Sequence, residues 1–595
     1  MNPSTFYRKR GAIRSIPVVS LREAVELVET SKRTESVIVL PPAAGDSTAD
    51  SDSEEVPDGV AEDTPFEPAG QMEVNVEASS ESESEKEIEE SSEMHPTKKR
   101  KVIIDSPKWS RMGRFKQSLD IGVRSKKMAD EYPFLIALSP YQIWKLFFTD
   151  TMLQEIVKQT LLYAHREKND KEFETSADEI RRFIGIALLS GYHTVPCNRD
   201  YWSNQPDLGV QFVSQAMTCG RYRKLAACMH LADNQSLAAG DKTAKVDPLY
   251  KKLNENLTQF GIWHDNISID ESMVPYFGKN SMKQFIRGKP IRFGFKLWAM
   301  CSSDGFPYHV SIYSGKDPEA VGPLGERVVT KMVDVLEQNS VLNTHHIFFD
   351  NFFTSYRLLF ALRERGVRAT GTIRENRTGG AHKVLMASSE LKKKQRGYFD
   401  SVCDGRICVV KWMDNSTVCI ASNSLTHEPT HVVRRYVKPN PNHSVQQPHI
   451  IHQYNSGMGG VDVMDRLLAS YRPMLRGKKW WWPLFLNAVN MSVVAAWKVH
   501  QHLHRGETDH LSFRRDIIMC VMKTDTPAVT TVSAGRRVDL PDDVRFDGVG
   551  HTSSTFSEGR CRVCSKNTKK GCLKCDARLH SDRGKKCFEH YHSRC

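Results

Sequence analysis

The spacing of apolar residues along the chain changes from helix-like to strand-like near residue 265. Before this point, three segments each begin with a polar capping residue and then place apolar side chains every three or four positions, as in amphipathic helices. They are "SPYQIWKLFF" (139–148), "TDTMLQEIVKQTLLYAHREK" (149–168) and "SADEIRRFIGIALLSGY" (176–192). Residues 133–264 are therefore predicted to be mostly helical.

Runs of β-branched and aromatic residues with the length of strands follow. They lie at 266–278, 291–315, 345–355 and 367–376, and a helical pattern at 320–339 separates the second run from the third. Strands mixed with helices predict an α/β domain.

A meander of short strands interrupts this pattern and predicts an inserted all-β unit. Its strands are "GYFDSVC", "RICVVKW" and "STVCIAS", joined at the turn sequences Asp404-Gly405 and Asp414-Asn415. Helical spacing returns at 480–504 and 511–524.

Charge is distributed unevenly along the chain. Residues 46–95 contain 18 acidic residues and one lysine, which gives a net charge of −17. Because the net charge of the whole chain is +12, the other residues together carry +29. The acidic, serine-rich composition of residues 41–95 favours disorder. One short helix is predicted before this region, at 20–30. A strongly basic remainder indicates a polyanionic partner, in particular nucleic acid.

A basic run follows the acidic region directly. It is "PTKKRKV", with Lys98, Lys99, Arg100 and Lys101, and it indicates a nuclear import signal bound by an import receptor, although a solvated charge run is the simpler alternative. The longest apolar run, "PLFLNAVNMSVVAAW", has 15 residues and two asparagines. We therefore expect a soluble, intracellular protein that is located in the nucleus and has no membrane partner.

Cysteines gather at the C-terminus, where six of the 14 lie between positions 561 and 595. Two CxxC pairs followed by histidines suit tetrahedral Zn²⁺. The candidate ligands are Cys561, Cys564, Cys572, Cys575, His580, Cys587 and His592. Seven ligands are one short of two complete sites, and either His590 or Cys595 is expected to supply the eighth.

Aspartates interrupt two apolar strand-like runs, at Asp270 in "ISIDESMVPYFG" and at Asp350 in "HIFFDNFFTS". A buried carboxylate is costly unless its charge is compensated. In "HQYNSGMGGVDVMDRL" (452–467), the end of a strand is expected to lead through glycines into a helix that carries Asp462 and Asp465 on one face. If these acids converge, they need divalent cations, and Mg²⁺ or Mn²⁺ with oxygen ligands would suit phosphodiester chemistry.

The blocks "SIDESMVPYFG", "FFDNFFTS" and "YNSGMGGVDVMD" resemble the catalytic blocks of piggyBac-family transposases, and the likeness runs from about residue 133 to the C-terminus. The resemblance implies an RNase H-like fold in which Asp270, Asp350 and Asp462 are catalytic and bind Mg²⁺, with Asp465 as a fourth required acid. It also implies cut-and-paste transposition of DNA: nicking of the transposon end, hairpin formation and joining of the 3′ ends to TTAA targets.

The implied organisation is an α/β, RNase H-like catalytic domain with an inserted all-β unit, a mostly helical domain and a small zinc-binding module. The helical domain would mediate homodimerisation and DNA binding, and the zinc-binding module would recognise transposon ends. The expected boundaries are 1–131 for the disordered region with the import signal, 132–265 and 467–540 for the helical domain, 266–376 and 436–466 for the catalytic domain, 377–435 for the β-rich insertion, 541–556 for a linker and 557–595 for the zinc-binding domain.

Two basic segments are candidates for contact with double-stranded DNA. "KQFIRGKPIRFGFK" carries Lys283, Arg287, Lys289, Arg292 and Lys296, and "RGKKWWWP" carries Lys478, Lys479 and, by resemblance, Trp482. A solvated hairpin and a tryptophan core are the structural alternatives.

The alternative functions are a domesticated, non-catalytic protein that binds DNA or chromatin, and a ubiquitin ligase or histone reader that acts through the zinc module.

Overall fold

The computed structural model describes three ranges of the chain. Residues 107–523 are described except for 112, 124–126, 239, 287–288, 317–320 and 438–439, with the backbone alone at 436–437 and 440–443. Residues 545–593 are described except for 547–549, 576 and 583, and near the N-terminus the backbones of three short strands are described. The chain divides into two units, one of residues 1–194 and 215–524 and one of residues 195–214 and 525–595.

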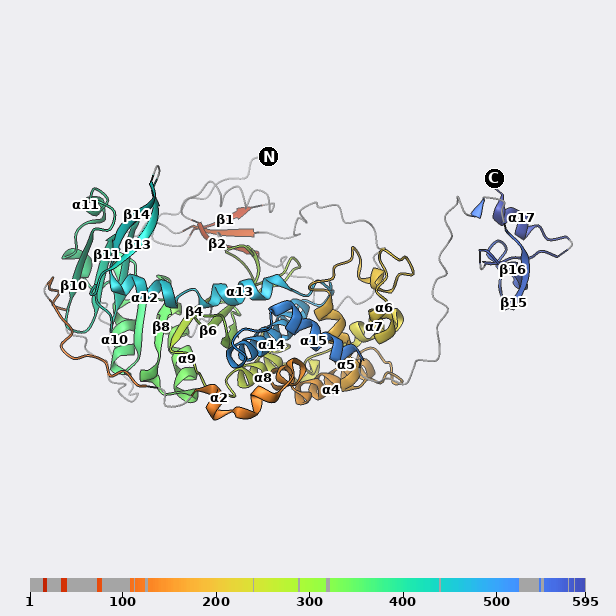
Figure 1. Ribbon diagram of the computed structural model, residues 1–595, viewed down its shortest axis with the longest axis horizontal. Helices are drawn as coiled ribbons and strands as arrows, with labels where there is room; N and C mark the ends of the chain where they lie inside the picture. Colours follow the sequence, from red (N-terminus) through yellow and green to blue (C-terminus); the bar gives the residue numbers. More distant parts are fainter. Residues whose placement is uncertain are drawn as a thin grey trace, which may run out of the picture. The chain divides into compact units, whose positions relative to one another are not determined.

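Helices predicted from the sequence open the first unit (Figure 1). Ser139, Thr149 and Ser176 each accept a hydrogen bond from a backbone amide of the following first turn, which is why α3, α4 and α5 begin where the sequence predicts. The helices of this region are α2 (Met128–Glu131), α3 (Pro140–Phe147), α4 (Asp150–Arg166), α5 (Ala177–Leu189), α7 (Cys219–Cys228) and α8 (Asp247–Leu257).

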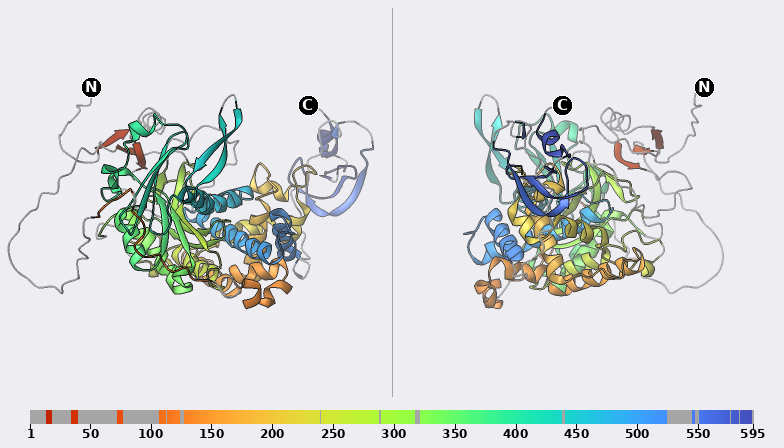
Figure 2. Two further views of the ribbon diagram at one scale, coloured as in Figure 1. Left: turned by 60° about the vertical axis from the view of Figure 1, so that its left-hand side comes forward. Right: turned by 90° about the vertical axis from the view of Figure 1, so that its right-hand side faces the viewer.

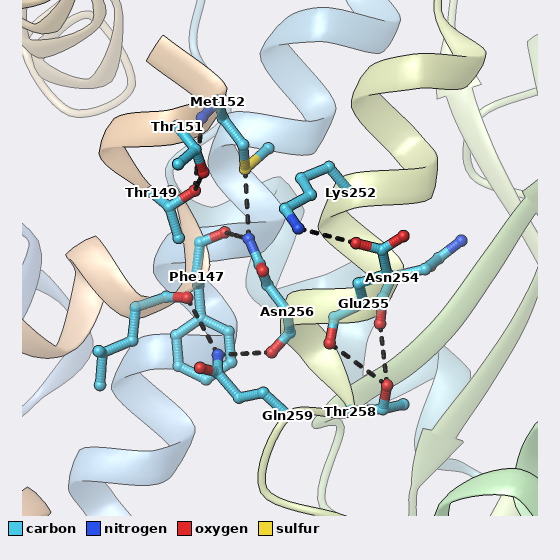
Figure 3. A network of polar contacts seen from close by, with 11 residues as sticks. Phe147, Thr149, Thr151, Met152, Lys252, Asn254, Glu255, Asn256, Thr258 and Gln259 are labelled. Atoms are coloured by element: carbon cyan, nitrogen blue, oxygen red, sulfur yellow. Dashed lines mark hydrogen bonds and ion pairs between the residues drawn. The ribbon is translucent and has the colours of Figure 1, made fainter. Parts of the chain in front are cut away.

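A polar network joins α8 to the start of α4 (Figure 3). The amide of Asn256, which is buried, donates to the carbonyl of Phe147 at 3.0 Å and approaches the sulfur of Met152 at 3.3 Å. One residue of α8 thus satisfies the C-terminal end of α3 and touches α4. This fixes α3 and α4 relative to α8.

A mixed sheet forms the centre of the first unit, with the order β7-β6-β4-β8-β9 (Figure 1). β6 is antiparallel to β4 and β7, whereas β4, β8 and β9 run parallel. The elements are β4 (Asn266–Pro275), β5 (Lys283–Phe285), β6 (Phe293–Ser302), β7 (Pro307–Ile312), α9 (Leu324–Asn339), β8 (His346–Phe349), α10 (Tyr356–Glu364) and β9 (Arg368–Thr372). The predicted mixed α/β architecture is confirmed.

The predicted meander is present, with β10 (Phe399–Cys403), β11 (Cys408–Met413) and β12 (Thr417–Ser422) joined at the two expected turns. It extends the central sheet, because β12 pairs with β9. The insertion also contains the short helix α11 (Ser388–Leu391), so it is not all-β. A separate two-stranded ribbon, β13 (His431–Val437) and β14 (Asn440–Gln447), extends beyond the expected boundary at 435 (Figure 2).

The segment 449–470 forms two consecutive helices, α12 (His449–Gly457) and α13 (Gly460–Ser470). The expectation that a strand end precedes the glycines is therefore wrong, since Tyr454 lies within α12. The unit ends with α14 (Trp482–Leu503) and α15 (His510–Lys523). Among the described helices, none combines the length and apolarity needed to cross a membrane.

Near the N-terminus, β1 (Arg14–Val18), β2 (Thr34–Val39) and β3 (Met72–Val76) add to the sheet edge at β5. The sequence predicted none of these strands. The helix expected at 20–30 and the import signal at Lys98–Lys101 lie outside the described residues.

The second unit contains a small C-terminal module of three strands and one helix. These are β15 (Ser553–Arg560), β16 (Asn567–Cys572), β17 (Ala577–Arg578) and α17 (Cys587–His592), with β16 at the centre of the sheet. The core is made largely of cysteine and histidine with only a few apolar residues, such as Leu579 and Tyr591. A fold with so little apolar core requires another source of stability.

Candidate active site and metal-binding groups

Asp270 and Asp350 lie beside each other on neighbouring parallel strands. The register pairs Ile269 of β4 with Phe349 of β8, so the next residue of each chain segment is an aspartate. Paired residues of adjacent strands point to the same face and lie about 5 Å apart. The carboxyl end of β8 therefore brings Asp350 next to Asp270 in the middle of β4.

Helix α13 carries the other two aspartates and packs closely on β4 and β6, whereas the preceding helix α12 contacts β8 (Figure 1). A Cβ atom at Gly460 would lie 2.1 Å from the carbonyl oxygen of Ser302, and one at Gly457 would lie 2.3 Å from the ring of Phe348. The glycines were expected to permit a tight turn, but Gly459 has an ordinary φ of −72°. Gly457 and Gly460 are needed because helix and sheet approach each other so closely.

Ser272 fixes the position of Asp465. It lies two residues after Asp270 on β4, and its hydroxyl donates to Asp465 Oδ1 at 2.5 Å. Alternation along a strand places Ser272 on the same face as Asp270. Asp462, one helical turn before Asp465, is the most exposed of the four aspartates and pairs with Lys289 at 3.7 Å. We call Asp270, Asp350, Asp462 and Asp465 the acidic cluster.

Burial makes negative charge costly in this cluster. Burial raises the pKa of Asp270 to about 7, with further increases from Glu271 and Asp350 and a decrease from Lys289. Burial also raises the pKa of Asp465 to about 6, against the hydrogen bond from Ser272, and it raises the pKa of Asp350. Such shifts mark groups whose charge needs compensation by a bound cation or by a function.

The donor chemistry of the acidic cluster fits a hard divalent cation, because every side chain offers carboxylate oxygens. The cluster is less compact than a formed metal site. Among the described residues, only two groups, both in the C-terminal module, bring three or more ligand atoms within 4.8 Å of one another. Lys289 explains part of this spacing, since its ammonium lies between Asp270 and Asp462. Mg²⁺ binding by Asp270, Asp350 and Asp462 stays a prediction.

The basic hairpin after β4 exposes fewer cations than its sequence suggests. Lys283 is buried and donates to the carbonyl of Gly278, and Lys296 lies over the Trp298 ring. Lys289 faces the acidic cluster, Arg292 is exposed, and Arg287 lies outside the described residues. DNA contact by this segment stays a prediction, and Arg292 is the exposed member that can test it.

The segment before α14 serves the helical core. Trp482 is 4% exposed, and its indole N–H donates to the carbonyl of Leu475. Lys479 donates to the carbonyls of Ala227 and Met229 at 2.8 Å each. The tryptophan core that was the structural alternative is therefore present. Lys478 is exposed.

The C-terminal module gathers two groups of four ligands, each able to hold a metal ion. One group contains Cys561, Cys564, His580 and Cys587, and the other contains His551, Cys572, Cys575 and His592. Along the chain, the pair Cys561/Cys564 belongs to the first group, Cys572/Cys575 to the second and His580/Cys587 again to the first. The two groups are therefore interleaved in sequence. The eighth member of these groups is His551, which was not predicted from the sequence because it stands ten residues before Cys561, outside any CxxC spacing.

The structure does not group His590 with the other candidates, and Cys595 lies outside the described residues, so metal binding by either of them is not tested. Thiolate and imidazole donors in groups of four match tetrahedral coordination. A lowered pKa of Cys561, about 6, also suits this role, because backbone amides and His580 stabilise its thiolate against burial.

Known proteins are similar to this chain in sequence and in fold. A family model described as Transposase IS4 matches residues 139–497. The human PiggyBac transposable element-derived protein 3 is 37% identical over 77% of this chain and 77% of its own length, and the human PiggyBac transposable element-derived protein 2 is 34% identical over the same shares. A piggyBac transposase solved by cryo-EM in a synaptic complex with hairpin DNA matches with a TM-score of 0.57 and 20% identity, covering 74% of this chain and 98% of that one.

Proposed function

Because the chain belongs to the piggyBac transposase family, we propose that it is a cut-and-paste DNA transposase. It nicks transposon ends, forms hairpins and joins the 3′ ends to TTAA targets. The observation that carries this proposal is the meeting of four aspartates from β4, β8 and α13 on one face of the central sheet. Burial of three of these carboxylates, Asp270, Asp350 and Asp465, raises their pKa values and is costly unless their charge is used or compensated.

The catalytic domain is RNase H-like in this proposal. The strand order β7-β6-β4-β8-β9, with only β6 antiparallel, supports that assignment. It places the first acid in the middle of the central strand and the second directly after the adjacent parallel strand. The last acids then come from a helix that crosses these strands.

Asp270, Asp350 and Asp462 would hold Mg²⁺ or Mn²⁺, and Asp465 would complete the acidic cluster. The bound cations supply charge that activates the attacking oxygen and stabilises the leaving oxygen. In the first step, water attacks phosphorus and the 3′ oxygen of the transposon end leaves. In the second step, this 3′ hydroxyl attacks a phosphorus of the opposite strand, the 3′ oxygen of the flanking DNA leaves, and the two transposon strands are joined as a hairpin.

Roles for the C-terminal module, the helical domain and the basic run at 98–101 follow from membership of the same family. The two four-ligand groups of the C-terminal module would bind Zn²⁺ and form a DNA-recognition module, supported by exposed Lys569, Lys585 and Lys586 beside the ligands. The helical domain would support a homodimer, because two transposon ends must be held together. The import signal at Lys98–Lys101 would bring the protein into the nucleus through an import receptor.

An excision assay tests the proposed function. A reporter carrying the matching transposon ends should be repaired to TTAA by the natural protein in the presence of Mg²⁺ and not by Asp350→Asn. Asp334→Asn is a matched control, because Asp334 lies on α9 and pairs with Arg365 away from the acidic cluster. DNA binding should be retained by both variants.

One alternative is a domesticated protein that binds DNA or chromatin without cleaving it. The names of the two human relatives, which describe them as derived from transposable elements, favour keeping this candidate. Failure of the natural protein to excise, with DNA binding intact, would select the alternative.

A further inference from the structure

Lys289 lies inside the acidic cluster. Its Nζ atom is 3.9 Å from Asp270 Oδ2 and 3.7 Å from Asp462 Oδ1, and it donates to the carbonyl of Glu271 at 3.3 Å. The side chain is only 21% exposed. Burial opposes its charge, yet Asp270, Glu271 and Asp462 keep its pKa above the usual value. One ammonium therefore links a strand aspartate to a helix aspartate.

The chain segment that carries Lys289 is a hairpin loop between β5 and β6. The loop is closed by a hydrogen bond from the amide of Ile286 to the carbonyl of Arg292. Lys289 thus reaches the aspartates from a loop, whereas the aspartates belong to a sheet and a packed helix. Of these partners, the loop residue is the one whose position can change at least cost.

Lys296 has no such freedom. Its ammonium lies 4.0 Å from the centre of the Trp298 ring and 5.2 Å from that of Phe352, and it pairs with Glu271 at 3.8 Å. The two rings and the rigid strand β6 hold it in place. Among the described cations at the cluster, Lys289 is therefore the one that combines a loop position with direct contact to two of the four aspartates.

We propose that Lys289 is an internal counter-ion that neutralises the acidic cluster in the DNA-free protein and transfers to a backbone phosphate when DNA binds, so that DNA binding promotes divalent-cation binding. This inference rests on the proposed function. The Lys289 ammonium and a divalent cation compete for the same carboxylates. The positive charge of the ammonium therefore lowers the affinity of these carboxylates for the divalent cation. A DNA phosphate offers the ammonium an alternative partner and releases the carboxylates for the cation.

Linkage makes the coupling reciprocal. If DNA raises the affinity for the divalent cation, the cation must raise the affinity for DNA by the same factor. Coupling of this kind would keep the nuclease without its cations until a DNA strand lies against the cluster. Lys289 is in this account a positioning residue, because it acts through the carboxylates.

The test measures binding of Mn²⁺ to the full-length, zinc-loaded protein by the loss of the free-ion electron paramagnetic resonance signal. Natural protein is compared with Lys289→Gln, Lys289→Arg and Lys279→Gln. Lys279 lies in the preceding connection, between β4 and β5, and is exposed, so it controls for loss of a surface charge. Each protein is measured alone and with a short TTAA-containing duplex, with the signal of the duplex alone subtracted.

Without DNA, we expect Lys289→Gln to bind Mn²⁺ about tenfold more tightly than the natural protein. A positive charge this close to a carboxylate changes the affinity of that carboxylate for another cation by a factor of about ten or more. DNA should raise the Mn²⁺ affinity of the natural protein, of Lys289→Arg and of Lys279→Gln by a larger factor than that of Lys289→Gln, in which only the direct contact of the cation with DNA phosphate remains. DNA affinity, measured by fluorescence anisotropy, should rise with Mn²⁺ by the correspondingly larger factor in the same three proteins.

Two results separate the possible failures. Equal Mn²⁺ affinities of Lys289→Gln and the natural protein, with binding abolished by Asp350→Asn, would overturn the inference and leave the proposed function intact. No Mn²⁺ binding sensitive to Asp350→Asn in any protein, with or without DNA, would overturn both.

Discussion

Substitution of Gly460 by alanine tests how closely α13 must approach the sheet. The added Cβ would lie 2.1 Å from the carbonyl oxygen of Ser302 and 3.1 Å from the Cβ of Ser268. A carbon–oxygen contact needs about 3.3 Å, so the helix must move by roughly 1 Å. The obstacle is backbone in the central sheet, which cannot rotate away as a side chain could.

The displacement also moves the proposed catalytic acids, because Asp462 and Asp465 follow within two turns of the same helix. Overpacking of this kind costs about 1–3 kcal/mol in stability. A misplacement of about 1 Å in a catalytic group costs roughly 100-fold in rate. We therefore expect Gly460→Ala to lower excision about 100-fold while the protein remains folded.

Gly459→Ala is the matched control. This neighbouring position has ordinary helical φ, and a Cβ there meets nothing within 4 Å. It should leave excision unchanged and raise stability slightly, since alanine loses less entropy on folding than glycine. Excision in the reporter assay and thermal unfolding would be measured for both variants. Natural activity of Gly460→Ala would refute the close approach of helix and sheet as the reason for the glycine.

Three further outcomes are expected. His551→Ala should reduce the bound zinc, counted by inductively coupled plasma mass spectrometry, from two equivalents to one, whereas His590→Ala should retain two; an unchanged count for His551→Ala would remove it from the ligand set. Ser272→Ala removes the hydrogen bond that lowers the pKa of Asp465, so the acidic limb of the excision pH profile should move to higher pH, and an unmoved limb would contradict the positioning role. Burial raises the pKa of Asp270 from 3.8 to about 7, so the folded chain retains a proton that the unfolded chain releases. The stability of the natural protein relative to Asp270→Asn, both without Mg²⁺, should therefore fall as pH rises from about 4 to about 7, and a rise of this difference in unfolding experiments would contradict the assignment.

Local sequence patterns predicted the elements of the first unit because the deciding interactions are local. Ser139, Thr149 and Ser176 are N-caps, and each accepts a hydrogen bond from the first turn of its own helix. The turn at Asp404-Gly405 is equally local, with Gly405 at φ +92°. The mixed α/β class follows from the same signals, since strand-length and helix-length patterns alternate.

Long-range pairings were beyond the sequence. The partner of Asp465 is Ser272, 193 positions earlier, although its spacing of two from Asp270 on a strand was a usable signal. The contact of Lys289 with the acidic cluster carried no signal, because a lysine among basic residues looks like a phosphate ligand. His551 was missed because coordination by an isolated histidine depends on a sheet that brings β15 beside β16.

Helix α12 was misassigned for a physical reason as well. Glycines usually end helices or open turns, so "NSGMGG" reads as a break between a strand and a helix. Here glycine is required at 457 and 460 because a Cβ atom would collide with Phe348 and Ser302. Helix α12 precedes this segment and α13 follows it. Tertiary packing overrode the local preference.

Anomalous diffraction from the DNA-bound protein with Mn²⁺ would locate the cations relative to the acidic cluster. We expect Mn²⁺ peaks within bonding distance of the carboxylates of Asp270, Asp350 and Asp462, with Lys289 turned to a DNA phosphate. DNA bound along the sheet with no manganese peak at these carboxylates would contradict this expectation.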